Sequence, residues 1–290
     1  MSLDFNELDK NVQEEVKINF STMHQDAVID LKKTYDRPPL AISIGLDSRE
    51  YMGTRYPLRF GTFGNISMIK GEEKSRKSFL KSMLLACAIG GNANFYNADI
   101  KGHNLQDKYI IDLDTEQDKF DNWLSANRIP KMIGQVDKPI AYDNYIPVNL
   151  REYSAKEIKG YLQWLFMESE YKNKLGIVSI DGFVDCVEDF NSLIECKEFT
   201  RDLMKYSSLT KSHITGVLHL NPNSDKARGH LGTILQQKCE TVVIIKDEGE
   251  YSSVICQRSR GKKFDPFAIS VDNNWLPYNF DAVITESWKK

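Results

Sequence analysis

The stretch Asn65-Ile-Ser-Met-Ile-Lys-Gly-Glu-Glu-Lys-Ser-Arg-Lys-Ser-Phe-Leu-Lys-Ser-Met-Leu-Leu-Ala-Cys-Ala88 joins an apolar run, a charged loop and a second apolar pattern. Residues 66–70 predict a short buried strand, and the apolar residues of 79–87 recur at the spacing of one helix face. The loop between them ends in Lys77-Ser78, as does the phosphate-binding pattern G-x-x-x-x-G-K-[ST]. The stretch therefore predicts a strand, a phosphate-binding loop and a helix.

Each part of this loop has a chemical role in nucleotide binding. Backbone N–H groups at the start of a helix bind an anion. The pattern assigns the β- and γ-phosphates to Lys77 and the magnesium ion to the Ser78 hydroxyl. The candidate nucleotide-binding residues are Gly71, Glu72, Glu73, Lys74, Ser75, Arg76, Lys77, Ser78 and Phe79. Arg76 stands where the pattern has its second glycine, so an ordinary strand–turn–helix with a surface Lys-Ser pair is the alternative.

Composition limits the class of protein. The chain has 290 residues and a net charge of −3, so no overall basic field indicates nucleic acid, and DNA contact requires a local patch. Its five cysteines form no C-x-x-C pair, and several lie in apolar runs, which predicts buried free thiols in a reducing compartment. No apolar run is long enough to span a bilayer, so we expect a cytoplasmic protein without membrane contact.

The pattern along the chain predicts two parts. Residues 1–37 form an amphipathic helical segment that ends before Pro38-Pro39, and 38–290 form one domain that contains the candidate phosphate-binding loop. Within the second part, predicted strands and helices alternate from 66 to 246, which indicates a mainly parallel sheet flanked by helices. Residues 47–62 are predicted to be irregular, and 252–258 with 264–271 to form an antiparallel terminal hairpin.

Polar residues follow several of the predicted strands. Asp114-Thr-Glu116 ends one strand, Asp181 ends the apolar run 177–180, and His219-Leu-Asn221 ends another. Ligands of open parallel sheets bind at the carboxyl ends of the strands. Asp181 fits a magnesium ligand, and Glu116 fits a general base that activates water. The alternatives are an Asp-Gly turn at Asp181 and a solvated carboxylate at Glu116.

In this order the motifs resemble those of RecA-like P-loop ATPases, and in particular the DnaB-type and plasmid RepA-type helicases and related AAA-family ATPases of mobile elements. The resemblance covers about residues 40–271. It implies ATP and Mg²⁺ as cofactors, with Lys77 and Ser78 on the phosphates and magnesium, Glu116 as catalytic base and Asp181 as the second magnesium residue. His219 and Asn221 correspond to a γ-phosphate sensor, although glutamine is commoner at the first position; a buried structural histidine is the alternative.

The same resemblance implies a ring and a nucleic-acid channel. Arg258-Ser-Arg260-Gly261 is similar to a hairpin motif whose basic residues reach a neighbour's nucleotide, and it leaves open which arginine does so. The segment 221–230 falls where the family has a DNA-facing loop, so Lys226 and Arg228 are candidate phosphate contacts to single-stranded DNA. An ordinary solvated loop is equally compatible with that segment.

Two functions follow from these residues. One is an ATP-hydrolysing motor of the helicase or replication type that acts on DNA as a hexamer-like homo-oligomer. The other is a nucleotide-dependent switch that gates protein partners without unwinding DNA. Glu116 and the two hairpin arginines favour the motor, whereas the balanced charge and Arg76 favour the switch.

Overall fold

The computed structural model describes residues 19–134, 136–221, 227–282 and 284, and the chain divides into two units, Met1–Arg37 and Pro38–Lys290. The described part of the first unit contains one helix, α1 (Phe20–Ala27). Its N-cap is Asn19, whose side-chain oxygen accepts hydrogen bonds from the backbone N–H groups of Ser21 and Thr22. Residues 1–18 of the predicted helical segment lie outside the described residues, whereas residues 28–37 are described and form no helix, so the helix ends well before Pro38-Pro39.

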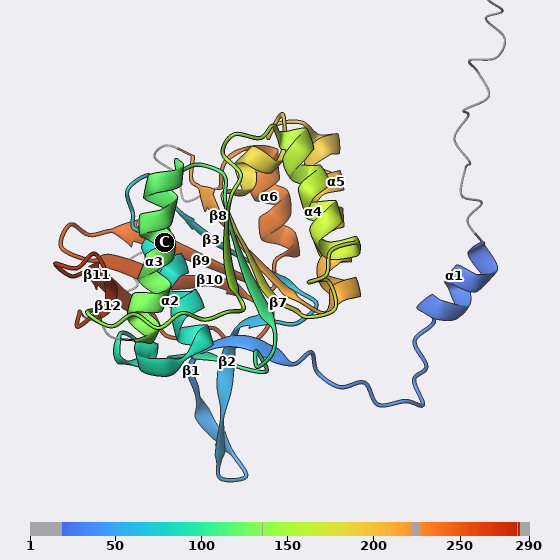
Figure 1. Ribbon diagram of the computed structural model, residues 1–290. Coiled ribbons are helices and arrows are strands. Elements are labelled where there is room, and N and C mark those ends of the chain that lie inside the picture. The colour runs from blue at the N-terminus through green and yellow to red at the C-terminus, as the bar shows by residue number, and fades with distance from the viewer. Residues whose placement is uncertain (1–18, 135, 222–226, 283, 285–290) are drawn as a thin grey trace, which may run out of the picture. The chain divides into compact units, whose positions relative to one another are not determined.

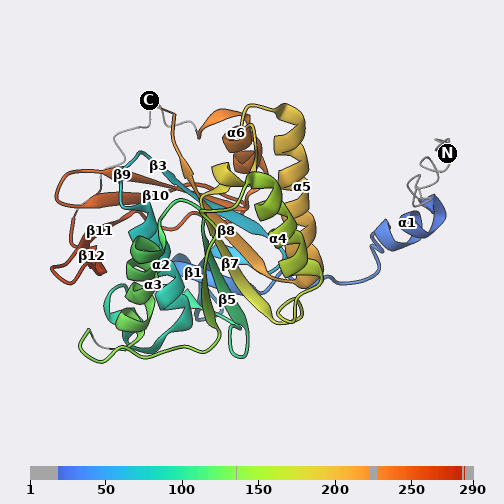
Figure 2. The same cartoon turned by 45° about the horizontal axis from the view of Figure 1, so that its top comes forward.

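The second unit is built around a nine-stranded sheet with the order β12-β11-β10-β9-β3-β8-β7-β5-β6 (Figures 1 and 2). Six neighbouring strands of this sheet are parallel, and the last three along the chain are antiparallel. The parallel strands are β3 (Ile66–Gly71), β5 (Tyr109–Asp114), β6 (Tyr145–Asn149), β7 (Leu175–Asp181), β8 (His213–His219) and β9 (Thr241–Asp247). The antiparallel strands are β10 (Ser252–Ser259), β11 (Phe267–Val271) and β12 (Pro277–Phe280).

Helices cover both faces of this sheet, as the strand–helix alternation predicts (Figure 1). One face carries α2 (Lys77–Ile89) and α3 (Lys119–Ile133); the other carries α4 (Ala155–Met167), α5 (Leu193–Thr210) and α6 (Gly229–Lys238). The described residues also contain two short 3-10 helices, Gly91–Phe95 and Phe183–Cys186. Neighbouring strand residues point to opposite faces, so Met68 packs under α5 and α6 whereas Ile69 packs under α2.

Local sequence signals explain several helix ends. Ser154 and Glu157 form the predicted capping box at the start of α4. Gly90 is the C-cap of α2 and has a φ of 102°, a backbone angle that favours glycine. All five cysteines are buried and free, which confirms the prediction from their apolar surroundings.

The prediction of an irregular segment at 47–62 is wrong. β1 (Leu40–Tyr51) and β2 (Thr54–Thr62) form a long antiparallel hairpin that extends beyond the main sheet, and β4 (Ile100–Gly102) adds to the other side of β1 (Figure 1). Four register irregularities interrupt the pairing of β1 with β2. Such bulges break the regular alternation of apolar and polar residues, which removes the signal by which a strand is predicted from sequence.

Candidate functional site

The predicted phosphate loop lies between the carboxyl end of β3 and the first turn of α2. Gly71 ends β3, where a Cβ atom would lie 2.5 Å from Ser75 Oγ and 2.6 Å from the carbonyl oxygen of Ile245. Only glycine fits there without displacing the neighbouring strand. Lys74 and Arg76 have left-handed backbone angles, with φ of 62° and 66°. The loop thus adopts a tight turn that directs the chain into α2.

Arg76 occupies the position of the second glycine in the phosphate-binding pattern. Left-handed backbone costs a non-glycine residue about 1 kcal/mol. The Arg76 guanidinium donates hydrogen bonds to Asp247 Oδ1 at 2.7 Å, to the Gly249 carbonyl at 2.7 Å and to Ser252 Oγ at 2.9 Å. These contacts hold the loop on the turn between β9 and β10 and offset the unfavourable backbone angle.

Lys77 is the first residue of α2, and its side chain folds back over the loop. Its ammonium donates to the carbonyl oxygen of Glu72. Burial lowers the pKa of Lys77, and the carboxylates of Asp181 and Glu116 partly oppose this effect. The ammonium therefore lies inside the loop's own concave surface, where a bound phosphate would replace the carbonyl as its partner.

Ser78 and Asp181 are in contact inside the site. Ser78 Oγ donates to Asp181 Oδ2 at 2.9 Å, and the Asp181 side chain is buried at the end of β7. A hydroxyl and a carboxylate are oxygen ligands of the kind that Mg²⁺ prefers, and Mg²⁺ commonly keeps several waters and phosphate oxygens as further ligands. No group of three or more His, Cys, Asp or Glu side chains suited to a metal occurs among the described residues. The pair fits a magnesium ion that arrives with a nucleotide.

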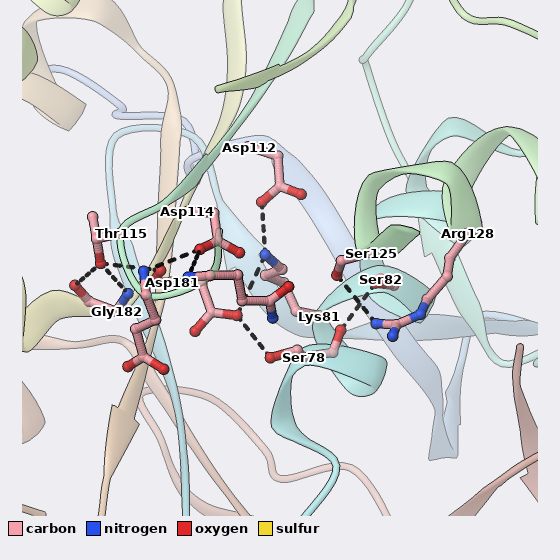
Figure 3. Close-up of polar contacts among 12 residues, drawn as sticks. Ser78, Lys81, Ser82, Asp112, Asp114, Thr115, Ser125, Arg128, Asp181 and Gly182 are labelled. Atoms are coloured by element: carbon pink, nitrogen blue, oxygen red, sulfur yellow. Dashed lines mark hydrogen bonds and ion pairs between the residues drawn. The ribbon is translucent and has the colours of Figure 1, made fainter. Parts of the chain in front are cut away.

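A buried lysine, Lys81, contacts the carboxylate of this pair (Figure 3). Lys81 Nζ lies 3.1 Å from Asp112 Oδ1 and 3.4 Å from Asp181 Oδ2. Burial alone would lower the pKa of Lys81, but the carboxylates of Asp112, Asp181 and Asp114 outweigh burial and raise it. Lys81 is not among the site residues predicted from sequence. The local sequence signal for it is that it follows Lys77 by four positions, which places a charged residue on the same face of the helix.

The residues after β5 place Glu116 at the pocket. Asp114 Oδ1 accepts the backbone N–H groups of Glu116 and Gln117 at 3.0 and 2.8 Å, which closes the turn after the strand. Burial raises the pKa of Asp114. Glu116 Oε1 lies 3.2 Å from His219 Nε2, at the end of β8. The predicted base and the predicted sensor are therefore neighbours.

A single cavity of about 390 Å³ contains most of the predicted site residues. It is lined by Lys74, Ser75, Arg76, Lys77, Ser78, Phe79, Glu116, Gln117, Arg128, Asp181 and His219. A larger cavity of about 590 Å³ lies between α3 and β6 and contains none of the predicted phosphate-loop residues. We therefore take the smaller cavity as the candidate nucleotide site, because the predicted phosphate, magnesium and base residues line it.

Arg128, which is not among the residues predicted from sequence, also lines this cavity, because α3 brings it there. Its guanidinium carbon lies 3.8 Å from the centre of the Phe79 ring, and it donates to Ser125 Oγ at 3.1 Å. Burial lowers the pKa of Arg128 to about 10, which leaves it charged near neutral pH. An adjoining cavity of about 580 Å³ shares Gln117 and Arg128 and includes Trp275, which is 70% exposed in the turn before β12. Nothing local in the sequence links α3 to that turn.

The structure does not bring the two hairpin arginines to this cavity. β10 runs antiparallel to β9, so its last residues lie at the edge of the sheet opposite the phosphate loop. Arg258 donates to the Gln236 carbonyl at 2.9 Å, and Arg260 donates to the Lys238 carbonyl at 2.9 Å. Both arginines thus bond the last carbonyls of α6, and neither can serve the phosphate loop of its own chain.

The remaining candidates follow β8. Asn221 Nδ2 donates to the Ala227 carbonyl at 3.4 Å and does not line the cavity. Arg228 lies at the N-cap of α6, with its guanidinium carbon 4.9 Å from the centre of the Phe190 ring. Lys226 lies outside the described residues.

Comparison with known proteins informs the fold alone. The chain matches no protein-family model and no curated protein. Among solved structures it is similar to the RadB recombinase, with a TM-score of 0.52 and 12% sequence identity over 76% of this chain and 92% of that one. No helix in the described part of the chain is long and apolar enough to cross a membrane. With its mainly parallel sheet flanked by helices and its antiparallel C-terminal strands, the second unit has a RecA-like α/β fold.

Proposed function

We propose that the protein binds Mg²⁺-ATP in the cavity around Lys77 and hydrolyses it as a RecA-like motor that acts on DNA. The observation that carries the proposal is the convergence of four strand ends on one cavity. The loop after β3 supplies Lys77 and Ser78, and β7 supplies Asp181. Glu116 follows β5 and His219 ends β8, and the two side chains face each other.

The proposed chemistry assigns each group a role. Lys77 would bind the β- and γ-phosphates, and Ser78 and Asp181 would hold a magnesium ion whose charge would offset that of the phosphates. Glu116 accepts the proton of the attacking water. Glu116 Oε1 lies 3.2 Å from His219 Nε2 and would accept a hydrogen bond from it, so a reorientation of Glu116 when the γ-phosphate departs would also change the contacts of His219.

The nucleobase has space beside this phosphate site. The cavity that contains Trp275 adjoins the phosphate cavity through Gln117 and Arg128. An exposed indole stacks well on a planar base, and the flat guanidinium of Arg128 offers a second surface. We place the base there.

Function as an ATP-hydrolysing motor requires an oligomer. Arg258 and Arg260 lie at the sheet edge opposite the phosphate loop, so they can complete a nucleotide site only on a neighbouring subunit. A hexamer-like homo-oligomer, as in the helicases that the motifs resemble, would supply that neighbour. The structural neighbour is named a recombinase, which agrees with action on DNA. Contacts of Arg228 and Lys226 with single-stranded DNA remain part of this proposal.

The nucleotide-dependent switch is the second candidate, and one observation favours it. Both hairpin arginines already bond the carbonyl end of α6, as structural residues do. A monomer that receives no arginine from a neighbouring subunit would hydrolyse ATP slowly, and its bound nucleotide would control its contacts with protein partners. DNA-stimulated turnover separates the two functions.

The test is ATP binding and hydrolysis with and without single-stranded DNA. Lys77→Ala should abolish ATP binding in calorimetry without unfolding the domain, whereas Lys205→Ala, on the exposed face of α5, should leave it unchanged. Equal ATP affinity in the wild type and in Lys77→Ala would refute the nucleotide site. Turnover that DNA does not stimulate would favour the switch.

A further inference from the structure

Next to the phosphate site lies a buried group of charged side chains, of which the proposed hydrolysis uses only Asp181. Lys81 is 2% exposed, and its ammonium contacts carboxylate oxygens of Asp112 on β5 and Asp181 on β7 (Figure 3). Asp112 Oδ2 also accepts a hydrogen bond from the Tyr145 hydroxyl at 3.0 Å. Asp114 is a third buried carboxylate in this group. We call Lys81, Asp112, Asp114 and Asp181 the sub-loop cluster.

The geometry shows which carboxylate Lys81 shares with the nucleotide site. Asp181 Oδ2 accepts from Ser78 Oγ at 2.9 Å and lies 3.4 Å from Lys81 Nζ. The same oxygen of Asp181 therefore contacts both Ser78, its partner in the proposed magnesium site, and the ammonium of Lys81. Lys81 lies one helical turn after Lys77, so both cations extend from one face of α2 toward Asp181.

The charge of the sub-loop cluster determines whether its carboxylates can bind a divalent cation. Buried carboxylates without a partner are strongly unfavourable, so three of them require a cation nearby. Without Lys81, the remaining carboxylates could recruit a divalent ion in the absence of nucleotide, since the attraction in a buried site is far stronger than in water. The lysine places a fixed positive charge where that ion would otherwise sit.

We propose that Lys81 is a resident cation of the sub-loop cluster, which positions Asp181 on Ser78 and restricts the site to the single magnesium ion that arrives with the nucleotide. This inference rests on the proposed function because it takes Asp181 as a magnesium residue. Lys81 is a positioning residue, since it contacts Asp181 and Asp112 and does not line the nucleotide cavity. Its effect is to make metal binding depend on nucleotide.

The test measures Mn²⁺ binding to the nucleotide-free protein by electron paramagnetic resonance. The wild type should bind Mn²⁺ weakly. Lys81→Met, which leaves the carboxylates unbalanced, should bind one Mn²⁺ at least about tenfold more tightly. Lys81→Arg keeps the charge and should behave as the wild type does.

The double variant Lys81→Met/Asp112→Asn is the matched control, because it removes one positive and one negative charge and keeps the net charge of the cluster. It should return Mn²⁺ affinity to the wild-type level. If Lys81→Met is only marginally stable, its melting temperature should rise on addition of Mn²⁺, whereas that of the double variant should not.

Two results would overturn the inference. One is wild-type Mn²⁺ affinity in Lys81→Met, or a poorly folded Lys81→Met that Mn²⁺ does not stabilise. The other is a double variant that binds Mn²⁺ as tightly as Lys81→Met does. Either result, with ATP hydrolysis by the wild type intact, would leave the proposed function standing; failure of the wild type to bind Mg²⁺-ATP would instead refute the function.

Discussion

His219 Nε2 lies 3.2 Å from Glu116 Oε1, so the end of β8 and the turn after β5 are joined by a polar contact at the candidate nucleotide cavity. Glycine at position 182 makes room for this contact, because a Cβ atom there would lie 3.0 Å from Glu116 Oε1. The carboxylate is thus held by its neighbours at one side of the cavity. This arrangement suits a base whose orientation responds to the γ-phosphate.

The contact leads to a prediction for turnover. Glu116→Gln should leave ATP affinity near that of the wild type and reduce the hydrolysis rate by roughly 10²–10⁴-fold, because a general base acts on the transition state more than on the bound ground state. Single-turnover hydrolysis and calorimetry measure the two quantities. Glu168→Gln, on the exposed end of α4, is the control. An unchanged rate would make Glu116 an ordinary solvated carboxylate.

A second prediction concerns the oligomer. An arginine supplied by a neighbouring subunit is worth about 10³–10⁵ in rate, so specific activity should rise with protein concentration. Mixtures of Arg260→Ala with Lys77→Ala subunits should recover activity, because one mixed interface pairs an intact loop with an intact arginine. The same mixture with Arg258→Ala identifies which arginine acts. Activity that is independent of concentration, with no complementation by either variant, would contradict the trans arrangement.

A third prediction locates the base. Trp275→Ala should weaken ATP binding by about tenfold, in line with the loss of one stacking interaction of roughly 1–3 kcal/mol. It should leave the binding of inorganic tripolyphosphate unchanged, because that probe has no base. Trp275→Phe should retain most of the ATP affinity. Equal losses for ATP and tripolyphosphate would show that Trp275 acts through the phosphate site or the fold.

A fourth prediction concerns pH. His213 is fully buried between β3 and β7, and burial lowers its pKa from 6.5 to about 4. The unfolded chain therefore takes up a proton at a higher pH than the folded protein does. The stability that neutral His213 contributes is complete above about pH 6.5 and is lost as pH falls toward 4, by on the order of 3 kcal/mol.

Urea unfolding across this pH range tests that prediction. The free energy of unfolding should fall less steeply with pH in His213→Gln than in the wild type, because the substituted side chain does not titrate. His24→Gln, in the exposed helix α1, should follow the wild type. Parallel curves for His213→Gln and the wild type would assign the acid sensitivity to other groups.

The sequence by itself determined the order of the fold. Strand and helix patterns along one chain are local, so the strand–loop–helix of 66–89, the alternation that follows it and the capping box of α4 were all readable from residue spacing. The strand ends that carry Glu116, Asp181 and His219 followed from the same patterns. The β1–β2 hairpin was missed because its irregular register hides the strand period.

Only the tertiary structure decided which distant residues meet. Lys81 and Asp112 are 31 positions apart and become an ion pair because α2 packs on the sheet over β5. Arg76 bonds a turn 171 residues away, and Arg128 reaches the nucleotide cavity from the far turns of α3. The antiparallel course of β10 sends Arg258 and Arg260 to the edge opposite the phosphate loop. Such contacts depend on strand order and helix packing, which local spacing does not encode.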